Sequence, residues 1–433
     1  MQIYNEQTKQ IETFKPLKNG EIKMYVCGPT VYSDIHIGNA RPIIFFDFVS
    51  KVFQKNGYNV VYVSNVTDVD DKIINRANEQ GISEQELVQI NMEAFSDVLN
   101  KLGVSYTHQP RVMETMDQII DFIDQLVKAE VAYVIDGDVY FDVSKVEDYG
   151  IVSNLNIEQN QEASRIEQNT KKRNPNDFTL WKETTQGINW ESPWSHGRPG
   201  WHTECVVMIR DLLGDKIDIH GGGIDLQFPH HENENAQSMA CSGPLANYWM
   251  HNGFININNE KMSKSLGNTF LAKDFINEYS TNILRLVMFQ TNYRQPINLT
   301  DEFIDSTKTI DNKFYDYAQR RTTLDMDFAL GETLTIVNKD FDAPNLITYL
   351  LQVIKDYSIE SQKIFNSGIY LLGLEYQVDE IPALIKELIN QREESKKAKD
   401  YQRADAIRDE IESQGYILKD TREGTLCMKA KNK

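Results

Sequence analysis

The segment from residue 22 to residue 67 limits the fold more than any other part of the sequence. Residues 22–27 (IKMYVC) alternate apolar and polar positions, which indicates a β-strand. Pro42 opens an apolar segment that ends at Gly57, as expected of a helix. Residues 58–67 (YNVVYVSNVT) are rich in β-branched side chains and predict a buried strand. A strand, a helix and a second strand in this order form a βαβ unit, which implies a parallel sheet.

The size and composition of the chain limit its class. At 433 residues it is too long for one hydrophobic core, so we expect roughly two to four domains. The sequence contains no run of about eighteen apolar residues and its N-terminus is polar, so we expect a cytoplasmic protein without a membrane segment. A net charge of −19 argues against a nucleic-acid coat protein. It leaves room for a local basic patch, and residues 391–433 contain slightly more basic than acidic side chains.

The rest of the chain divides into a second part of the sheet and a helical region. Residues 132–143 predict a hairpin with an Asp-Gly turn, and the polar residues 152–176 resemble a loop-rich insertion. A helix over 198–214 and a strand over 215–226 then resume the sheet, whereas strands are scarce from about residue 270 onward. The expected fold class is therefore α/β, with a Rossmann-like parallel-sheet domain that carries an insertion and is followed by C-terminal α-helical domains.

The motif HIGN, His36 to Asn39, lies in the turn between the first strand and its helix. In an open parallel sheet, ligands bind at the carboxyl ends of the strands. Gly38 would let an adenine or a phosphate approach the backbone, and a helix starting near Ala40 would offer free N–H groups to phosphate. Taken alone, this stretch is equally consistent with a polar turn after a strand.

The motif KMSKS, Lys261 to Ser265, is more specific. Lys261 and Lys264 could neutralise the charge that builds up on a leaving pyrophosphate. Serine and glycine suit a loop that closes over ATP. Taken alone the motif could be a solvated basic loop, but its pairing with HIGN on a βαβ pattern favours nucleotide chemistry.

Residues 221–237 (GGGIDLQFPHHENENAQ) pose the question of a metal site. If Pro229 begins a helix, His230 and Glu234 lie one turn apart on one face, and His231 with Glu234 is geometrically almost as good. Spacing alone does not decide between the two histidines. The sequence HHENE differs from the zinc-protease patterns. The four cysteines are far apart and form neither a CxxC pair nor a disulfide framework.

Together these motifs resemble a known family. HIGN followed by KMSKS resembles the signature pair of class I aminoacyl-tRNA synthetases, with Asn39 where the usual fourth residue is His. CGPTVY (27–32), NVTDVDDK (65–72), GRPGWHTEC (197–205) and FPHHENE (228–234) resemble the cysteinyl-tRNA synthetases among them. The resemblance extends from residue 22 to about 300 and returns in the C-terminal segment KAKDYQRADAIRDEIESQGYILKDT.

The resemblance implies a reaction, a set of ligands and a set of site residues. L-cysteine would react with ATP and Mg²⁺ to give cysteinyl-adenylate, and the cysteinyl group would pass to the terminal adenosine of tRNA(Cys). Zinc prefers a thiolate to a hydroxyl, so one zinc ion per chain would select cysteine over serine, for which an apolar pocket is poorly suited. The implied residues are Cys27, Cys205, His230 and Glu234 for zinc; Cys27, Thr67 and Trp201 for cysteine; Gly38, Asp225 and Lys264 for ATP; and His36, Asn39, Lys261 and Lys264 for catalysis. His202 and His220 receive no role.

The resemblance also implies a domain order and partners. The expected segments are 1–115 and 199–250 for the two halves of the catalytic domain, 116–198 for a connective insertion, 251–311 for the KMSKS loop and stem-contact region, 312–378 for a helical bundle, and 379–433 for an anticodon-binding tail. In the tail, the residues expected to contact tRNA are Lys396, Tyr401, Arg403 and Asp405. The tail departs from the family in its ending GTLCMK. We expect a monomer that binds tRNA, cysteine and ATP. The alternatives are a paralogue that passes cysteine to a small amine and a silent tRNA-binding relative.

Overall fold

A computed structural model describes residues 1–154, 171–262, 267–319, 328–377, 381–421 and 424–429. Its centre is a four-stranded sheet in the order β11-β10-β3-β4, in which every pair of neighbours is parallel. The strands are β3 (Glu21–Val26), β4 (Asn59–Ser64), β10 (Ile217–Gly223) and β11 (Ala246–Asn252). The predicted parallel sheet is confirmed.

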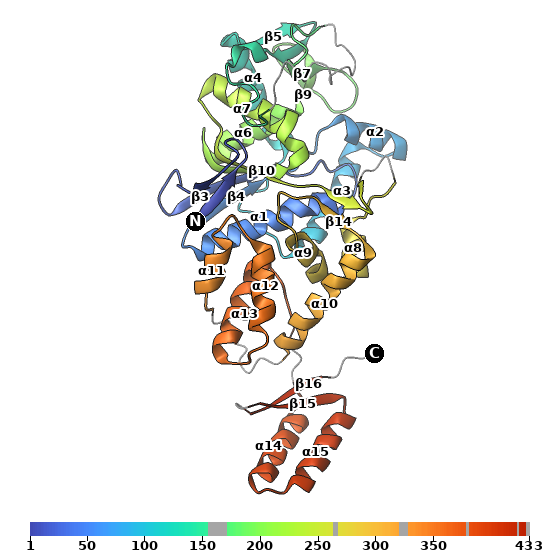
Figure 1. Cartoon of the computed structure of the whole chain (residues 1–433). Coiled ribbons are helices and arrows are strands. Elements are labelled where there is room, and N and C mark those ends of the chain that lie inside the picture. Colours follow the sequence, from blue (N-terminus) through green and yellow to red (C-terminus); the bar gives the residue numbers. More distant parts are fainter. Residues whose placement is uncertain (155–170, 263–266, 320–327, 378–380, 422–423, 430–433) are drawn as a thin grey trace.

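The sheet separates two hydrophobic cores, because successive side chains of a strand point to opposite faces. In β3, Met24 belongs to the core beneath helix α1 (Ile37–Lys55), while the adjacent Tyr25 belongs to the core beneath α6 (Trp201–Leu213). Figure 1 shows α1 on one side of the sheet and α6 and α7 (Glu232–Cys241) on the other. The chain thus covers both faces of the sheet, as parallel sheets require.

Helix α1 begins earlier than the sequence predicted. It starts at Ile37, so Pro42 lies inside the helix and the predicted start at Pro42, or near Ala40, is wrong. The earlier start is stabilised because His36 caps the first turn, although Pro42 cannot donate a backbone hydrogen bond within the helix.

A second sheet is formed by the residues between the two halves of the parallel sheet. Its order is β5-β6-β7-β9-β8, with all neighbours antiparallel. The predicted hairpin is confirmed, and its turn residues Asp136 and Gly137 both have positive φ. The strands are β5 (Ala132–Ile135), β6 (Asp138–Phe141), β7 (Phe178–Glu183), β8 (Trp190–Glu191) and β9 (His196–Pro199).

The remaining elements are short strands and helices around these sheets. The strands are β1 (Gln2–Asn5), β2 (Gln10–Thr13), β12 (Ile255–Ile257), β13 (Glu260–Lys261) and β14 (Ile297–Leu299). The helices are α2 (Asp71–Gln80), α3 (Glu84–Leu102), α4 (Met116–Lys128), α8 (Ala272–Glu278), α9 (Thr281–Phe289), α10 (Asp301–Ala318), α11 (Gly331–Val337), α12 (Ala343–Val353) and α13 (Ile359–Leu372). None of the helices in the described ranges is both long and apolar enough to cross a bilayer.

The C-terminal residues form a unit with its own small core. Helices α14 (Ala383–Lys397) and α15 (Tyr401–Ser413) pack with the hairpin of β15 (Tyr416–Thr421) and β16 (Gly424–Lys429). The core contains Ile385, Leu388, Ile407, Ile411, Leu418 and Cys427. Figure 1 shows this unit beyond the α10–α13 helices.

Two features of this unit differ from the sequence pattern. The hairpin was not predicted, since the sequence indicated only that strands are scarce after about residue 270. The spacing of Tyr401, Ala404, Ile407 and Ile411 predicts one apolar stripe, but Tyr401 is 62% exposed, whereas Ala404, Ile407 and Ile411 are buried. Tyr401 is the first residue of α15 and lies beyond the edge of the packed surface, so its ring faces solvent.

Candidate active site

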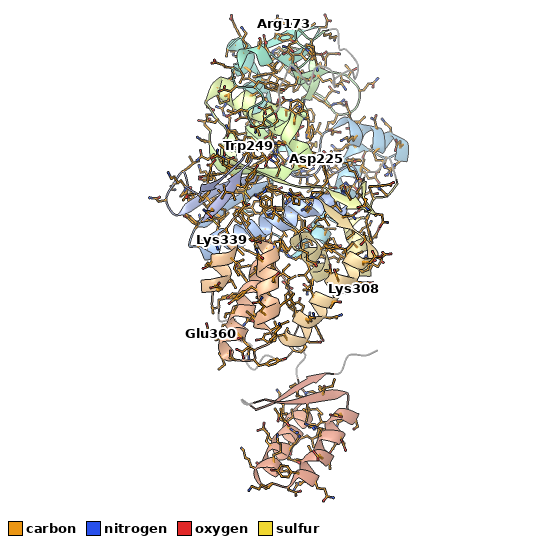
Figure 2. All side chains as sticks on the ribbon, in the orientation of Figure 1. Arg173, Asp225, Trp249, Lys308, Lys339 and Glu360 are labelled. Carbon is orange, nitrogen blue, oxygen red and sulfur yellow. The ribbon has the colours of Figure 1, made fainter. Side chains whose placement is uncertain are left out.

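A cleft of about 350 Å³ opens at the carboxyl ends of the parallel strands. Strand order reverses between β3 and β10, and such a switch point is where open parallel sheets bind ligands. The predicted residues among those that line the cleft are Cys27, His36, Gly38, Asn39, Trp201, Asp225 and Lys261. Figure 2 shows Asp225 near the level of the parallel sheet, and Lys264 lies outside the described residues.

The HIGN motif builds the start of α1. His36 is the N-cap, and its Nδ1 accepts a hydrogen bond from the backbone N–H of Asn39 at 3.2 Å. In return, the Asn39 Oδ1 accepts from the backbone N–H of His36 at 3.3 Å. The two side chains therefore hold each other at the helix N-terminus, where the helix dipole favours negative charge.

Gly38 brings the second motif against the first. A Cβ at this position would lie 2.9 Å from His36 Nδ1 and 2.9 Å from the terminal methyl of Met262. Met262 belongs to KMSKS and is buried, so the absence of a side chain at residue 38 lets the two motifs pack in direct contact. Beside it, the Lys261 ammonium lies 3.9 Å from the centre of the Phe254 ring, a cation–π contact.

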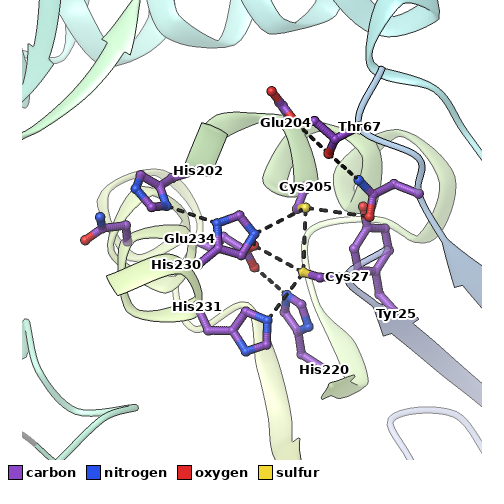
Figure 3. A network of polar contacts seen from close by, with 12 residues as sticks. Tyr25, Cys27, Thr67, His202, Glu204, Cys205, His220, His230, His231 and Glu234 are labelled. Atoms are coloured by element: carbon purple, nitrogen blue, oxygen red, sulfur yellow. Dashed lines mark hydrogen bonds and ion pairs between the residues drawn. The ribbon is translucent and has the colours of Figure 1, made fainter. Parts of the chain in front are cut away.

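Four of the predicted side chains converge behind the cleft and form a candidate metal centre (Figure 3). The Cys27 and Cys205 sulfurs are 3.7 Å apart, and Cys205 Sγ lies 3.7 Å from His230 Nε2. Glu234 Oε1 lies 3.5 Å from Cys27 Sγ and 2.7 Å from His230 Nε2. A tetrahedral zinc ion with bonds of roughly 2.0–2.3 Å would separate its ligands by roughly 3.3–3.8 Å. All but one of these four distances lie in that range, so the donor set fits the ion.

The local helix explains why His230 and Glu234 meet. Pro229 lies in a kinked segment, Gln227–His231, in which Phe228 has extended backbone angles (φ −137°, ψ 132°), and α7 follows directly from Glu232. A helix beginning at Pro229 was considered from the sequence, and the regular α-helix begins after this kinked segment instead. The spacing of one turn nevertheless holds across the junction, because His230 contacts Glu234.

A second group of donors includes His220, to which the sequence assigned no role, and His231, which the spacing left as the alternative to His230. Cys27, His220, His231 and Glu234 also offer ligand atoms that all lie within 4.8 Å of one another. His220 Nε2 contacts Glu234 Oε2, and His231 Nδ1 lies 2.8 Å from His251 Nε2. His220 follows Ile219 on β10, and its closeness to Cys27 depends on the pairing of β10 with β3, so no local sequence signal marks it.

The buried charges favour a cation at this position. Burial by itself would raise the pKa of Glu234, but His230 and His220 lower it well below its ordinary value. The hydrogen bond from Cys27 lowers the pKa of Cys205 to about 6, and burial raises that of Cys27 well above its ordinary value. One thiolate and one carboxylate are therefore available at neutral pH, and a metal ion would compete with protons for both.

Thr67 and Trp201 lie in different environments. Trp201 is 40% exposed and stacks on the ring of His230, with ring centres 4.1 Å apart. Thr67 is buried, and its hydroxyl donates to Glu204 Oε2 at 3.2 Å and accepts from Asn65 at 3.3 Å. Trp201 lines the cleft, whereas Thr67 is not among the described residues that line it.

The predicted tRNA contacts lie far from this cleft along the chain, on α14 and α15. Lys396 pairs with Asp420 at 3.1 Å, while the side chains of Tyr401, Arg403 and Asp405 are exposed. They belong to the C-terminal unit of Figure 1.

Known proteins share both the sequence and the fold of this chain. The family model of the tRNA synthetases class I (C) catalytic domain matches residues 13–309. The cysteine–tRNA ligase of Staphylococcus haemolyticus (strain JCSC1435) is 44% identical, and that of Staphylococcus aureus (strain Newman) 45% identical, each over 98% of both chains.

Two solved structures share the fold at low identity. The methionyl-tRNA synthetase of Mycobacterium tuberculosis in complex with methionyl-adenylate has a TM-score of 0.56 at 16% identity, covering 81% of this chain and 88% of the other. The ternary complex of Agrobacterium radiobacter K84 agnB2 LeuRS, tRNA and LeuAMS has a TM-score of 0.57 at 10% identity, with 83% of each chain covered. The sequence matches extend over both signature motifs and all four candidate ligands, and the chain belongs to the cysteine–tRNA ligase family of class I aminoacyl-tRNA synthetases.

Proposed function

We propose that the chain joins L-cysteine to tRNA(Cys) in two steps. In the first, the carboxylate of cysteine attacks the α-phosphate of ATP, which gives cysteinyl-adenylate and releases pyrophosphate. In the second, a hydroxyl of the terminal adenosine of tRNA displaces AMP. Membership of the cysteine–tRNA ligase family supports the overall reaction. The expected cytoplasmic location and monomeric state are part of the same proposal.

The rate of activation would come from alignment and from charge stabilisation. His36 and Asn39 hold the N-terminus of α1, where the helix dipole would favour the negative charge of a phosphate. Lys261 and Lys264 would neutralise the departing pyrophosphate, with Mg²⁺ bound to the ATP. Gly38 would admit the nucleotide, and Asp225 would bind its ribose. No side chain needs to form a covalent intermediate.

Selection of cysteine would depend on the cluster of Cys27, Cys205, His230 and Glu234. The convergence of these four donors beside the cleft is the observation that carries the proposal. A bound zinc ion would supply affinity for the substrate thiolate, which the hydroxyl of serine lacks. The alternative group with His220 and His231 shares Cys27 and Glu234, so it belongs to the same centre. Trp201 and Thr67 would shape the cysteine pocket.

The proposed function also assigns a role to each segment of the chain. Residues 1–115 and 199–250 would form the catalytic domain, 116–198 the connective insertion, and 251–311 the KMSKS loop with the stem-contact region. Residues 312–378 would form the helical bundle, and 379–433 the unit that binds the anticodon.

Two assays on the purified chain test the proposal. The first measures cysteine-dependent exchange of labelled pyrophosphate into ATP, and the second measures charging of a tRNA with a GCA anticodon. We expect activity in both. Absence of exchange would refute cysteine activation, whereas exchange without charging would favour a paralogue that transfers cysteine to a small amine.

A further inference from the structure

Arg41 is an unusual side chain because its charged group is buried among backbone carbonyls. It lies on α1, is 1% exposed, and follows Asn39 of HIGN by two residues. Among the residues that the structure describes, no carboxylate pairs with it, and burial lowers its pKa to about 10. Burial of a guanidinium costs free energy unless its N–H groups are hydrogen-bonded, so the partners of Arg41 indicate what its burial achieves.

The guanidinium binds two chain segments at once. Nη1 donates to the carbonyls of Gly253 at 2.6 Å and Phe254 at 2.9 Å. Nη2 donates to Tyr293 at 3.1 Å and Gln295 at 2.7 Å, with a longer contact of 3.5 Å to Asn292. These carbonyls point at one buried spot, and without a cation their dipoles would repel one another.

The first of these segments belongs to the wall of the active-site cleft, and the second is bonded to it. Gly253 and Phe254 connect β11 to β12 and line the cleft, as does Lys261 at the end of the β12–β13 hairpin. The second segment precedes β14, and it is joined to the first because the Gly253 N–H donates to the Tyr293 carbonyl at 2.8 Å.

Phe254 continues the connection to the catalytic loop. Its carbonyl accepts from Arg41, and its ring lies beneath the Lys261 ammonium at 3.9 Å. A chain of direct contacts thus runs from the HIGN helix through Arg41 and Phe254 to the first lysine of KMSKS.

We propose that Arg41 is a positioning residue. It holds Lys261 and the cleft wall at Gly253 and Phe254 at the distance from the HIGN motif that ATP binding requires. This inference rests on the proposed function only for the identity of the nucleotide. Arg41 itself is buried under the wall and does not reach the substrate. Its effect passes through the backbone of residues 253 and 254 and the Phe254 ring.

The comparison of three variants tests this role. Arg41→Lys keeps the charge but offers one ammonium in place of the planar fork, and Arg41→Met removes the charge. The control is Arg285→Lys, because Arg285 is also fully buried and donates to the carbonyls of Leu372 at 2.7 Å and Leu102 at 2.9 Å, outside the residues that line the cleft, although it also pairs with Asp47.

We expect a selective defect in ATP use. In pyrophosphate exchange, Arg41→Lys should raise KM for ATP about tenfold and lower kcat, and leave KM for cysteine within about twofold, because misplacement of about 1 Å at such a site can cost about a hundredfold in rate. Arg41→Met should be worse than Arg41→Lys. Arg285→Lys should lower the melting temperature comparably and leave both KM values within about twofold. Equal ATP kinetics in Arg41→Lys and Arg285→Lys would overturn the proposal.

A second variant covers the case in which the Arg41 variants do not fold. Phe254→Leu keeps an apolar side chain at a half-buried position and removes the ring beneath Lys261. It should raise KM for ATP several-fold, by about the same factor as Lys261→Met, without raising KM for cysteine. An unchanged KM for ATP in Phe254→Leu would contradict the contact chain.

Binding of a non-hydrolysable nucleotide separates this inference from the proposed function. Titration with α,β-methylene-ATP in the absence of cysteine should show at least about fivefold weaker binding to Arg41→Lys than to the unmodified chain. If the unmodified chain binds this analogue but shows no exchange with cysteine, the proposed function fails while the role of Arg41 is still tested. Equal binding to both proteins would refute the role of Arg41.

Discussion

At the scale of single residues, the candidate metal centre depends on donors from three separate parts of the chain. Cys27 follows β3, Cys205 lies on α6, and His230 and Glu234 lie on either side of the start of α7 at Glu232. The sulfur of Cys205 is buried and lies 3.7 Å from both Cys27 Sγ and His230 Nε2. Replacing this one atom tests the whole assignment.

We expect Cys205→Ser to bind zinc at least about tenfold more weakly and to lose most of its discrimination against serine. Once the metal is lost, one small side-chain difference gives only about 10- to 200-fold selectivity. The measurement is metal content by mass spectrometry together with exchange driven by cysteine and by serine. Cys241→Ser, at an exposed cysteine, is the control and should change neither. A Cys205→Ser protein that retains its zinc and its selectivity would disprove the assignment.

Gly38 supports a second prediction at this scale. In Gly38→Ala the new methyl would lie 2.9 Å from both His36 Nδ1 and the Met262 methyl. The Met262 methyl can turn away, but the His36 ring is fixed by its bond to the backbone of Asn39. We therefore expect kcat/KM for ATP in exchange to fall about tenfold or more while thermal stability changes little, since alanine favours helix by about 0.5–1 kcal/mol.

The control for Gly38→Ala is Gly331→Ala at the start of α11, where a Cβ would meet nothing within 4 Å. It should leave exchange unchanged. Wild-type kinetics in Gly38→Ala would show that the close approach of the two motifs is not needed for activation.

The same residues show how far the sequence could define the site. Spacing predicted that either His230 or His231 could share a ligand set with Glu234, and the structure contains a donor group for each. Only the resemblance to the family chose His230. The involvement of His220 depends on which residue of β3 it pairs with, and strand register is a tertiary property that a single sequence does not state.

At the scale of elements, the sequence predicted best where hydrophobic period and turn chemistry agreed. The parallel strands β3 and β4 and the Asp-Gly hairpin of β5 and β6 followed from such signals. The start of α1 was misplaced because Pro42 was taken as its first residue, while the cap is His36, a weaker N-cap signal than serine or aspartate. The β15–β16 hairpin was missed because its strands carry many polar residues.

One carboxylate of this C-terminal hairpin pairs with basic side chains from both of its helices. Asp420 on β15 accepts from Arg392 on α14 at 2.8 and 2.9 Å, and Lys396 and Arg408 lie at 3.1 and 3.3 Å. Hydrogen bonds from Arg392 and Lys396 hold the pKa of Asp420 well below its usual value. Because the folded-state pKa is depressed, Asp420 stabilises the fold above its unfolded pKa of about 3.9, and this contribution is lost as the pH falls further.

We expect Asp420→Asn to loosen the hairpin at pH 7 but not at pH values well below about 4. Amide hydrogen exchange of β15 and β16 in the full chain should be about fivefold faster in the variant at pH 7, corresponding to about 1 kcal/mol for a carboxylate that solvent partly screens. The difference should persist at pH 5 and shrink below about pH 4. Asp409→Asn, on the exposed side of α15, is the charge-matched control, and an equal effect of both substitutions would contradict the prediction.

At the scale of the whole molecule, the cleft and the residues predicted to contact tRNA lie on different parts of the chain. The cleft uses residues from β3 to β13, whereas the predicted anticodon contacts lie on α14 and α15, which have a core of their own. The order of these parts was predictable because the HIGN, KMSKS and HHENE motifs mark the catalytic half. The position of the C-terminal unit in space was not, because it depends on a connection with no distinguishing sequence pattern.

This separation predicts that a substitution in the C-terminal unit affects charging and leaves activation intact. Arg403 is exposed on α15, so it is free to bind a tRNA phosphate and would release a counterion when it does so. We expect Arg403→Ala to lower kcat/KM for tRNA about tenfold and to leave the rate of pyrophosphate exchange within about twofold. The slope of log binding constant for tRNA against log salt concentration should become shallower by about one. The control is Lys355→Ala, which removes an equally exposed positive charge between α12 and α13. Equal charging by the two variants would mean that Arg403 contributes only to the general charge of the chain.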